Sequence, residues 1–131
     1  MVDFISIDMA NKMLHLVGPI VNCISEQWSI ISSSLDNLEQ IFSPDADGTI
    51  HLDTVAISLK RATKSLNKGL DELEELGCSL ENIKEGAVDF PSIIEGERVM
   101  LCWKLGEEEI LHYHKRGENM QHRLLIKQVL E

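Results

Sequence analysis

Cysteine is scarce in this chain of 131 residues, so disulfide chemistry has little to act on. Cys23, Cys78 and Cys102 are odd in number, widely spaced and include no C-x-x-C pair. This pattern argues against a disulfide framework or a zinc-ribbon site and favours reduced thiols in the cytoplasm. Long apolar runs are also missing, because none approaches the ~20 residues needed to cross a bilayer. The amino-terminal stretch has Asp3 and no basic residue, so we expect no secretory signal.

Basic residues are few as well. Lysine and arginine number 12 against 22 aspartates and glutamates, which gives a formal net charge of −10. A surface with this field repels phosphate backbones and anionic lipid, so we expect neither nucleic acid nor membrane as a partner. The length predicts one domain over residues 1–131. The chain contains no P-loop, dinucleotide fingerprint or nucleophile motif, so we predict no cofactor.

Helical periodicity is the strongest pattern that is present. Apolar residues recur at alternating steps of three and four along residues 14–42, as in the seam of a coiled coil. They are Leu14, Val17, Val21, Ile24, Trp28, Ile31, Leu35, Leu38 and Phe42. A second series spans residues 52–76, with leucine at every seventh place from 52 to 73. Both stretches are therefore predicted to be long helices.

The two helices are joined by only nine residues, 43–51, so they should fold back on each other. Ser6 is a suitable N-cap for the first helix. Gly77 follows the second helix and suits the left-handed residue that closes it. The sequence therefore predicts a long antiparallel two-helix hairpin over residues 6–77.

After this hairpin the period changes to that of short strands. Strands are predicted at residues 88–91, 98–104 and 109–115, with turns at 95–96 and 105–108. A small three-stranded antiparallel meander over residues 86–115, packed on the hairpin, makes an α+β fold. The tail, residues 116–131, is compatible with a short helix or a docked extended segment.

Three motifs stand out in this second half: GAVDFP at residues 86–91, LCWKLGE at 101–107, and the pair Tyr113–His114. In this order they resemble a small prokaryotic family of unknown function, with a helical first half followed by G-[LV]-VDFP, LCW-[KR]-LGE, WH and a closing Gly-Phe-x-Gly-Arg. The resemblance implies no activity. It singles out Asp89, Pro91, Cys102, Trp103, Gly106, Glu107, His114 and Arg123. The chain departs from the pattern at Tyr113, where tryptophan is expected, and it lacks the glycines before Arg123.

Four of these residues form a candidate functional cluster: Asp89, Glu107, His114 and Arg123. If the meander brings them together, a carboxylate beside a histidine suits general acid/base work, and an arginine suits a carboxylate or phosphate ligand. The alternative is structural: Asp89 bonds a loop backbone and Arg123 holds the tail by a salt bridge. We favour the structural interpretation, because charge clusters mark functional sites only statistically. No catalytic residue is assigned.

A divalent metal is a weaker alternative. The spacing His112-x-His114 puts two imidazoles on one face of a strand, and His122 is a candidate third ligand. If Lys104 pairs with Glu109 across a four-residue loop, Cys102 lies on the opposite face from both histidines. A thiolate–imidazole site would then need a bulge to reverse that parity.

Charge along the second helix points to self-association. Lys60, Arg61, Lys64 and Lys68 occupy its middle, and Asp71, Glu72, Glu74 and Glu75 crowd its end. Acidic side chains there oppose the helix dipole. A second copy of the helix, antiparallel and crossing near Lys68, would set each basic block against an acidic one. The alternative is a solvated acidic face that keeps the protein soluble.

The sequence thus predicts a non-enzymatic cytoplasmic interaction or ligand-binding module, most simply a homodimer formed through its helices. The alternative is a small enzyme or metal-binding protein that uses the cluster around Asp89 and His114.

Overall fold

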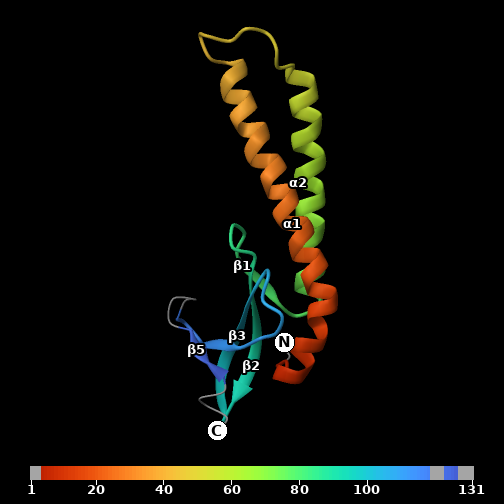
Figure 1. The fold of residues 1–131 in the computed structure, drawn as a ribbon. Helices are drawn as coiled ribbons and strands as arrows, with labels where there is room; N and C mark the ends of the chain where they lie inside the picture. The colour runs from red at the N-terminus through yellow and green to blue at the C-terminus, as the bar shows by residue number, and fades with distance from the viewer. Residues whose placement is uncertain (1–3, 119–122, 127–131) are drawn as a thin grey trace.

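A computed structural model describes residues 4–118 and 123–126 and shows two helices and one sheet (Figure 1). The elements are α1 (Ile7–Ile41), α2 (Leu52–Glu75), β1 (Ser79–Asn82), β2 (Ala87–Ile94), β3 (Glu97–Lys104), β4 (His112–Lys115) and β5 (Leu124–Leu125). The five strands pair in chain order, each antiparallel to the next. The predicted α+β class is confirmed, with five strands where three were expected.

Both ends of the helical hairpin follow the expected chemistry. The hydroxyl of Ser6 accepts a hydrogen bond from the backbone N–H of Met9 at 3.1 Å, which caps α1. Gly77 has a φ of +88° and ends the second helix, as a residue without a Cβ can. No helix among the described residues has the length and apolar character that a membrane crossing requires.

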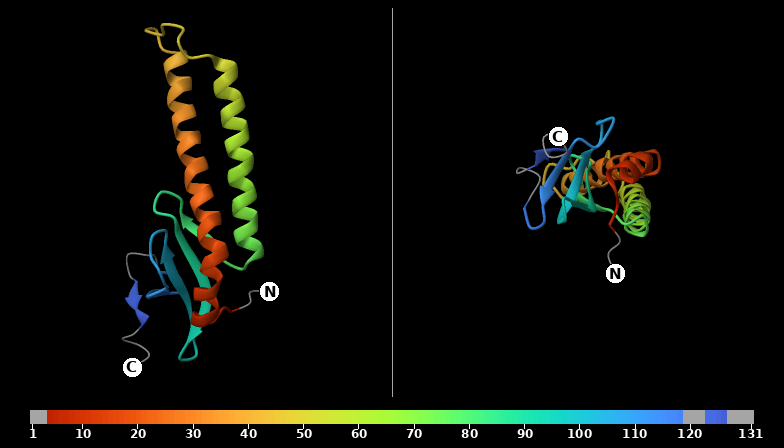
Figure 2. Two further views of the ribbon diagram at one scale, coloured as in Figure 1. Left: turned by 45° about the vertical axis from the view of Figure 1, so that its right-hand side comes forward. Right: turned by 90° about the horizontal axis from the view of Figure 1, so that it is seen from below.

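Helix α1 is the central layer of the molecule. It lies between the sheet and α2 over its first half, and beyond the sheet the two helices continue as a projecting pair (Figure 2). The predicted seam is buried at Val17, Val21, Ile24 and Ile31. Further along, the same seam emerges into solvent, and Phe42 is 74% exposed. The periodicity therefore marks the apolar face correctly but not how far a partner covers it.

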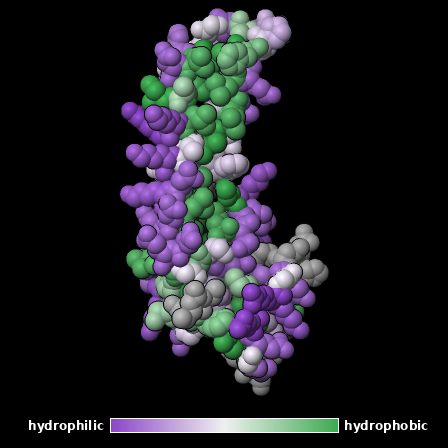
Figure 3. All heavy atoms as spheres, turned by 180° about the vertical axis from the view of Figure 1, so that it is seen from behind, coloured by the Kyte–Doolittle hydropathy of each residue, from purple (hydrophilic) through white to green (hydrophobic). Residues whose placement is uncertain are grey.

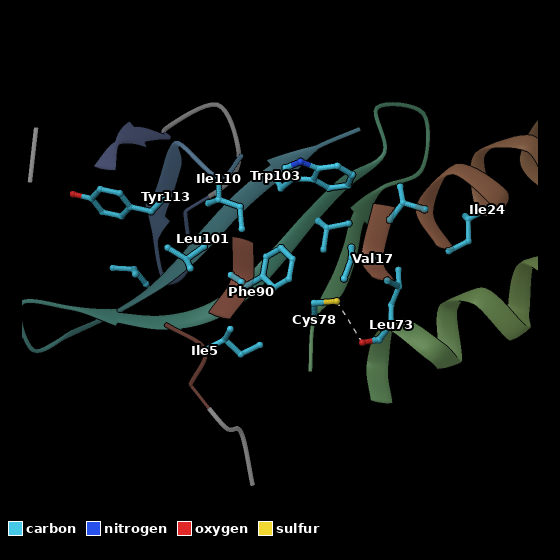
Figure 4. Close-up of a cluster of buried hydrophobic side chains, with 14 of the residues drawn as sticks. Ile5, Val17, Ile24, Leu73, Cys78, Phe90, Leu101, Trp103, Ile110 and Tyr113 are labelled. Atoms are coloured by element: carbon cyan, nitrogen blue, oxygen red, sulfur yellow. Dashed lines mark hydrogen bonds between the residues drawn. The ribbon is translucent and has the colours of Figure 1, made fainter. Parts of the chain in front are cut away.

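The main core lies where all three layers meet (Figure 4). Phe90 and Leu101 contribute from the sheet, Val17 from α1 and Leu73 from α2, and each of them is almost fully buried. The thiol of Cys78 also lies in this core and donates a hydrogen bond to the carbonyl oxygen of Leu73 at 3.4 Å. Because α1 supplies side chains to both neighbours, helices and sheet share one core.

Gly69 sets the distance between the two helices. A Cβ placed on this residue would lie 2.6 Å from Cγ1 and 3.0 Å from Cδ1 of Ile24. The absence of a side chain therefore lets α1 approach α2 closely, and Ile24 fills the space.

Two strands were not anticipated. β1 follows the helical hairpin directly and is mostly polar and exposed, so it has no apolar alternation to reveal it. β5 has two residues and lies in the tail, for which the sequence left a short helix and a docked extended segment open. The described part pairs with β4, and the N–H of Ile126 donates to the carbonyl of Leu111 at 2.9 Å.

The predicted loop between the last two strands of the meander is wrong. Cys102 pairs with His112, so the connection runs through residues 105–111 instead of 105–108. The pairing is shifted by one residue from the predicted one, which places Cys102 and His112 on the same face of the sheet. The extra length is held by specific contacts. The backbone carbonyl of Glu107 accepts from Trp103 Nε1 at 2.8 Å, and the N–H of Ile110 donates to the side-chain oxygen of Asn11 at 2.7 Å.

We predict that Gly69→Ala destabilises the fold by up to about 2 kcal/mol. Alanine improves helix propensity by about 1 kcal/mol, but its Cβ overlaps Ile24, and overpacking typically costs about 1–3 kcal/mol. Chemical denaturation of both proteins measures the difference. Asn67→Ala at an exposed position of α2 is the control, and it should be mildly stabilising because propensity acts there alone. Equal stabilisation by both substitutions would contradict the close helix approach.

Candidate functional site

The polar residues of interest lie on the sheet face opposite the core. Neighbouring residues of a strand point to opposite faces. Phe90, Leu101 and Tyr113 face the core (Figure 4), so Asp89, Cys102 and the histidines on either side of Tyr113 face away from it. Cross-strand pairing then places Asp89 beside Cys102, and Cys102 beside His112.

Asp89 and His114 form the centre of the site. Asp89 Oδ2 lies 2.9 Å from His114 Nε2, and both side chains are buried to about 95%. Burial raises the pKa of Asp89 above its ordinary value, and the hydrogen bond and charge of His114 act in the opposite direction. Two predicted members of the candidate cluster are therefore in direct contact.

The second nitrogen of the same imidazole fixes where its protons lie. His114 Nδ1 is 3.0 Å from the carbonyl oxygen of Lys115. A carbonyl only accepts, so Nδ1 carries a hydrogen and donates it. One further proton is shared between Nε2 and the Asp89 carboxylate. The other carboxylate oxygen, Asp89 Oδ1, is buried and has no hydrogen-bond partner among the described groups.

Cys102 completes the cluster and was not expected there. One ligand atom from each of Asp89, Cys102 and His114 lies within 4.8 Å of the other two. Burial, followed by the negative charge of Asp89, raises the pKa of the Cys102 thiol well above its ordinary value. The thiol is therefore protonated at neutral pH, and in this state it is a poor nucleophile.

Glu107 and Arg123, the other two predicted residues, form a separate pair. Arg123 Nη2 donates to Glu107 Oε2 at 3.1 Å, and Glu107 Oε1 accepts from the backbone N–H of Lys104 at 2.8 Å. Among the described residues no hydrogen bond joins this pair to Asp89 or His114. The pair ties the segment before β5 to the β3–β4 loop, which is the structural role that sequence reasoning favoured for Arg123.

Of the three histidines proposed for a metal, His114 belongs to the compact group of ligand atoms among the described residues and His112 does not. His112 shares the face of His114, but its Nδ1 has no partner among the described groups, and burial followed by the charge of Arg123 lowers its pKa. His122 lies outside the described residues. The compact set includes a thiol and a carboxylate instead.

The alternation of apolar residues contained the signal for this arrangement. Val88 and Phe90, Leu101 and Trp103, and Tyr113 all belong to the core. Because alternate residues of a strand point to opposite faces, the residues between and beside these apolar ones must lie on the other face of the sheet. This conclusion needs no assumption about loop length.

A hollow of about 630 Å³ borders the cluster. Asp89 and His114 line it, together with polar residues such as Glu81, Lys104 and Arg116. Two of the three buried cluster residues, Asp89 and His114, thus border a polar recess.

A second candidate surface is the projecting part of the helical hairpin. Apolar side chains form a column along the rear face of the two helices (Figure 3). The large apolar residues exposed on the outer half of the hairpin are Ile30, Leu35, Phe42, Leu52 and Ile57. Soluble proteins seldom leave such a surface uncovered without a use.

The fold and site together define an α+β protein in which a helical hairpin backs an antiparallel sheet, with a buried carboxylate–thiol–imidazole cluster on the far face. The chain belongs to the family described as "Uncharacterized conserved protein (DUF2203)", which matches residues 4–126. The resemblance to a family of unknown function is confirmed at this level. Comparisons with curated proteins and with solved structures gave no match.

We predict that one thiol reacts rapidly in the folded protein and that two do not. Cys23 is exposed, whereas Cys78 and Cys102 are buried, and burial raises the pKa of the Cys78 thiol to about 11. A colorimetric thiol titration should find one fast group natively and three in denaturant. Cys23→Ser should remove the fast phase. Rapid native alkylation of Cys102, identified by mass spectrometry, would contradict the protonated thiol.

Proposed function

We propose that this protein is a non-enzymatic interaction module of the cytoplasm that forms a homodimer through its helices. The proposal is carried by the order of side chains on one face of α2. Ile57, Lys64, Lys68 and Glu75 follow one another at steps of seven, four and seven residues, so they share a face. All four are exposed.

Charge order on this face favours a second copy of the same helix as the partner. In an antiparallel pair that crosses at Lys68, residues whose numbers sum to 136 lie opposite each other. Arg61 then faces Glu75 of the second copy, and Lys64 faces its Glu72. Twofold symmetry repeats each contact, so one basic and one acidic block per chain are sufficient.

Ile57, the apolar residue on this face, also meets an apolar surface of the second copy. With a rise of about 1.5 Å per residue, Ile57 lies about 16 Å from the crossing, and Glu75 lies about 10 Å away on the other side. In the pair, Ile57 therefore reaches about 6 Å beyond the end of the second copy's α2. A groove of about 640 Å³ begins there, bordered by Glu75 and lined by apolar groups that include Phe4, Pro91 and Met100.

The site on the sheet supports an interaction module over an enzyme. The four predicted cluster residues divide into two pairs. The hydrogen bonds of Glu107 and Arg123 hold the loop and the tail together. The nearby thiol is protonated, so it offers no nucleophile. Three unpaired cysteines support a reducing compartment, and the net charge of −10 disfavours nucleic acid and membrane partners.

We predict that the wild-type chain has the mass of a dimer in light scattering after size exclusion and that Ile57→Asp has the mass of a monomer. The substitution puts a charge into an apolar contact that the dimer buries. The matched control is Leu124→Asp, because Leu124 is 44% exposed, compared with 52% for Ile57, and lies on β5 at the sheet edge far from α2. A wild-type chain that is monomeric at low salt would contradict the proposal.

Charge reversal tests the antiparallel direction. Arg61→Glu and Glu75→Arg should each weaken dimerisation at low salt, since each brings like charges together. The double variant should restore it, because both pairs are reformed with opposite sign. Failure of the double variant to recover any affinity would contradict this geometry, provided that circular dichroism shows all proteins folded.

A further inference from the structure

The cluster of Asp89, Cys102 and His114 has the ligand set of a metal site. Thiolate sulfur, imidazole nitrogen and carboxylate oxygen are the three donor types that proteins use for zinc. They come from three adjacent strands, β2, β3 and β4, whose pairing fixes their positions. We propose that these three residues bind one zinc-class divalent cation, with the fourth coordination position open toward the polar recess.

The distances fit this proposal after a small adjustment. The three ligand atoms already lie within 4.8 Å of one another. Zinc bonds of about 2.0–2.3 Å at tetrahedral angles place ligand atoms roughly 3.3–3.8 Å apart. The longest separation therefore needs to shorten by roughly 1 Å. A turn of the Cys102 side chain about its Cα–Cβ bond supplies movement of this size without displacing the strands.

The imidazole is already oriented as a metal ligand. Its Nδ1–H donates to the carbonyl of Lys115, which leaves Nε2 as the atom that faces Asp89 and Cys102. Metal-binding histidines usually have such a bond on the nitrogen away from the metal, because it fixes the tautomer and the ring orientation.

The Asp89 side chain provides evidence for a ligand that does not depend on the imidazole. Its Oδ1 atom is buried and has no hydrogen bond of good geometry among the described groups, and the Cys102 thiol is the one side-chain donor besides His114 that acts on this carboxylate. An unsatisfied buried carboxylate oxygen is costly. A cation held between Asp89 and Cys102 satisfies it and compensates two negative charges in one place.

The donor set also selects the class of metal. A thiolate and an imidazole favour zinc and similar borderline ions over Mg²⁺ and Ca²⁺, which prefer oxygen. Asp89 and His114 line the recess, so a water molecule or the carboxylate of Glu81 at the rim can occupy the fourth position.

Binding of Zn²⁺ must release a fixed number of protons from the three ligands. The Cys102 thiol loses one proton as the metal–sulfur bond forms. The proton shared between Asp89 and His114 leaves as both atoms turn to the metal. Each Zn²⁺ therefore releases two protons, and no oxidation or reduction occurs.

Titration of metal-free full-length protein tests the proposal. Calorimetry with Zn²⁺ in buffers of different ionisation enthalpy should give one ion per chain and about two protons released. Co²⁺ should show a thiolate charge-transfer band and the visible bands of tetrahedral coordination. Cys102→Ser should abolish the charge-transfer band, and Asp89→Asn should weaken binding at least tenfold.

Matched controls separate this set from other ligands. Cys78→Ser removes another buried thiol, and His112→Gln removes the neighbouring imidazole, so both should keep the band and the stoichiometry. The proposal is overturned if the wild-type chain takes up no stoichiometric Zn²⁺ or Co²⁺. It is equally overturned if the band survives Cys102→Ser or disappears in His112→Gln. The wild-type proton count decides the matter even if a variant does not fold.

Discussion

The packing of α1 between the sheet and α2 is the interaction on which the rest of the molecule depends. A sheet of this size needs a cover on one face, and a two-helix hairpin alone buries too little to be stable. Both requirements are met by one helix, because Val17 faces the strands while Ile24 fits against Gly69 of α2. Removing either contact therefore weakens a core that both halves share.

This arrangement also determines where function can lie. Because the inner sheet face is committed to α1, the polar residues of the strands collect on the opposite face, where Asp89, Cys102 and His114 meet beneath a recess. Because the sheet covers only the first half of α1, the outer half of the hairpin keeps its apolar side chains exposed. The cluster thus lies on the sheet and the apolar column on the projecting hairpin, whereas the groove proposed to receive Ile57 shares Met100 and Arg116 with the recess beside the cluster.

Sequence reasoning was accurate where a periodic pattern had a direct physical cause. The heptad steps, the Ser6 cap and Gly77 define the helical hairpin, since each depends on local geometry. It failed where tertiary contacts decide. The polar strand β1 exists only because β2 pairs with it, and the length of the β3–β4 loop depends on Glu107 and Asn11, whose partners no local rule supplies. If Leu101 and Tyr113 are both taken to face the core, Cys102 must share the opposite face with the histidines. The assumed four-residue loop led to the wrong face for Cys102.

Native-state hydrogen exchange measured residue by residue tests the shared core most directly. We expect backbone amides around Val17 and Ile24 and those of β2 and β3 to exchange through the same opening, with equal free energies that fall together in denaturant. If the amides of α1 exchange many times faster while the sheet stays protected, helices and sheet are separate cooperative units, and the central role of α1 is contradicted.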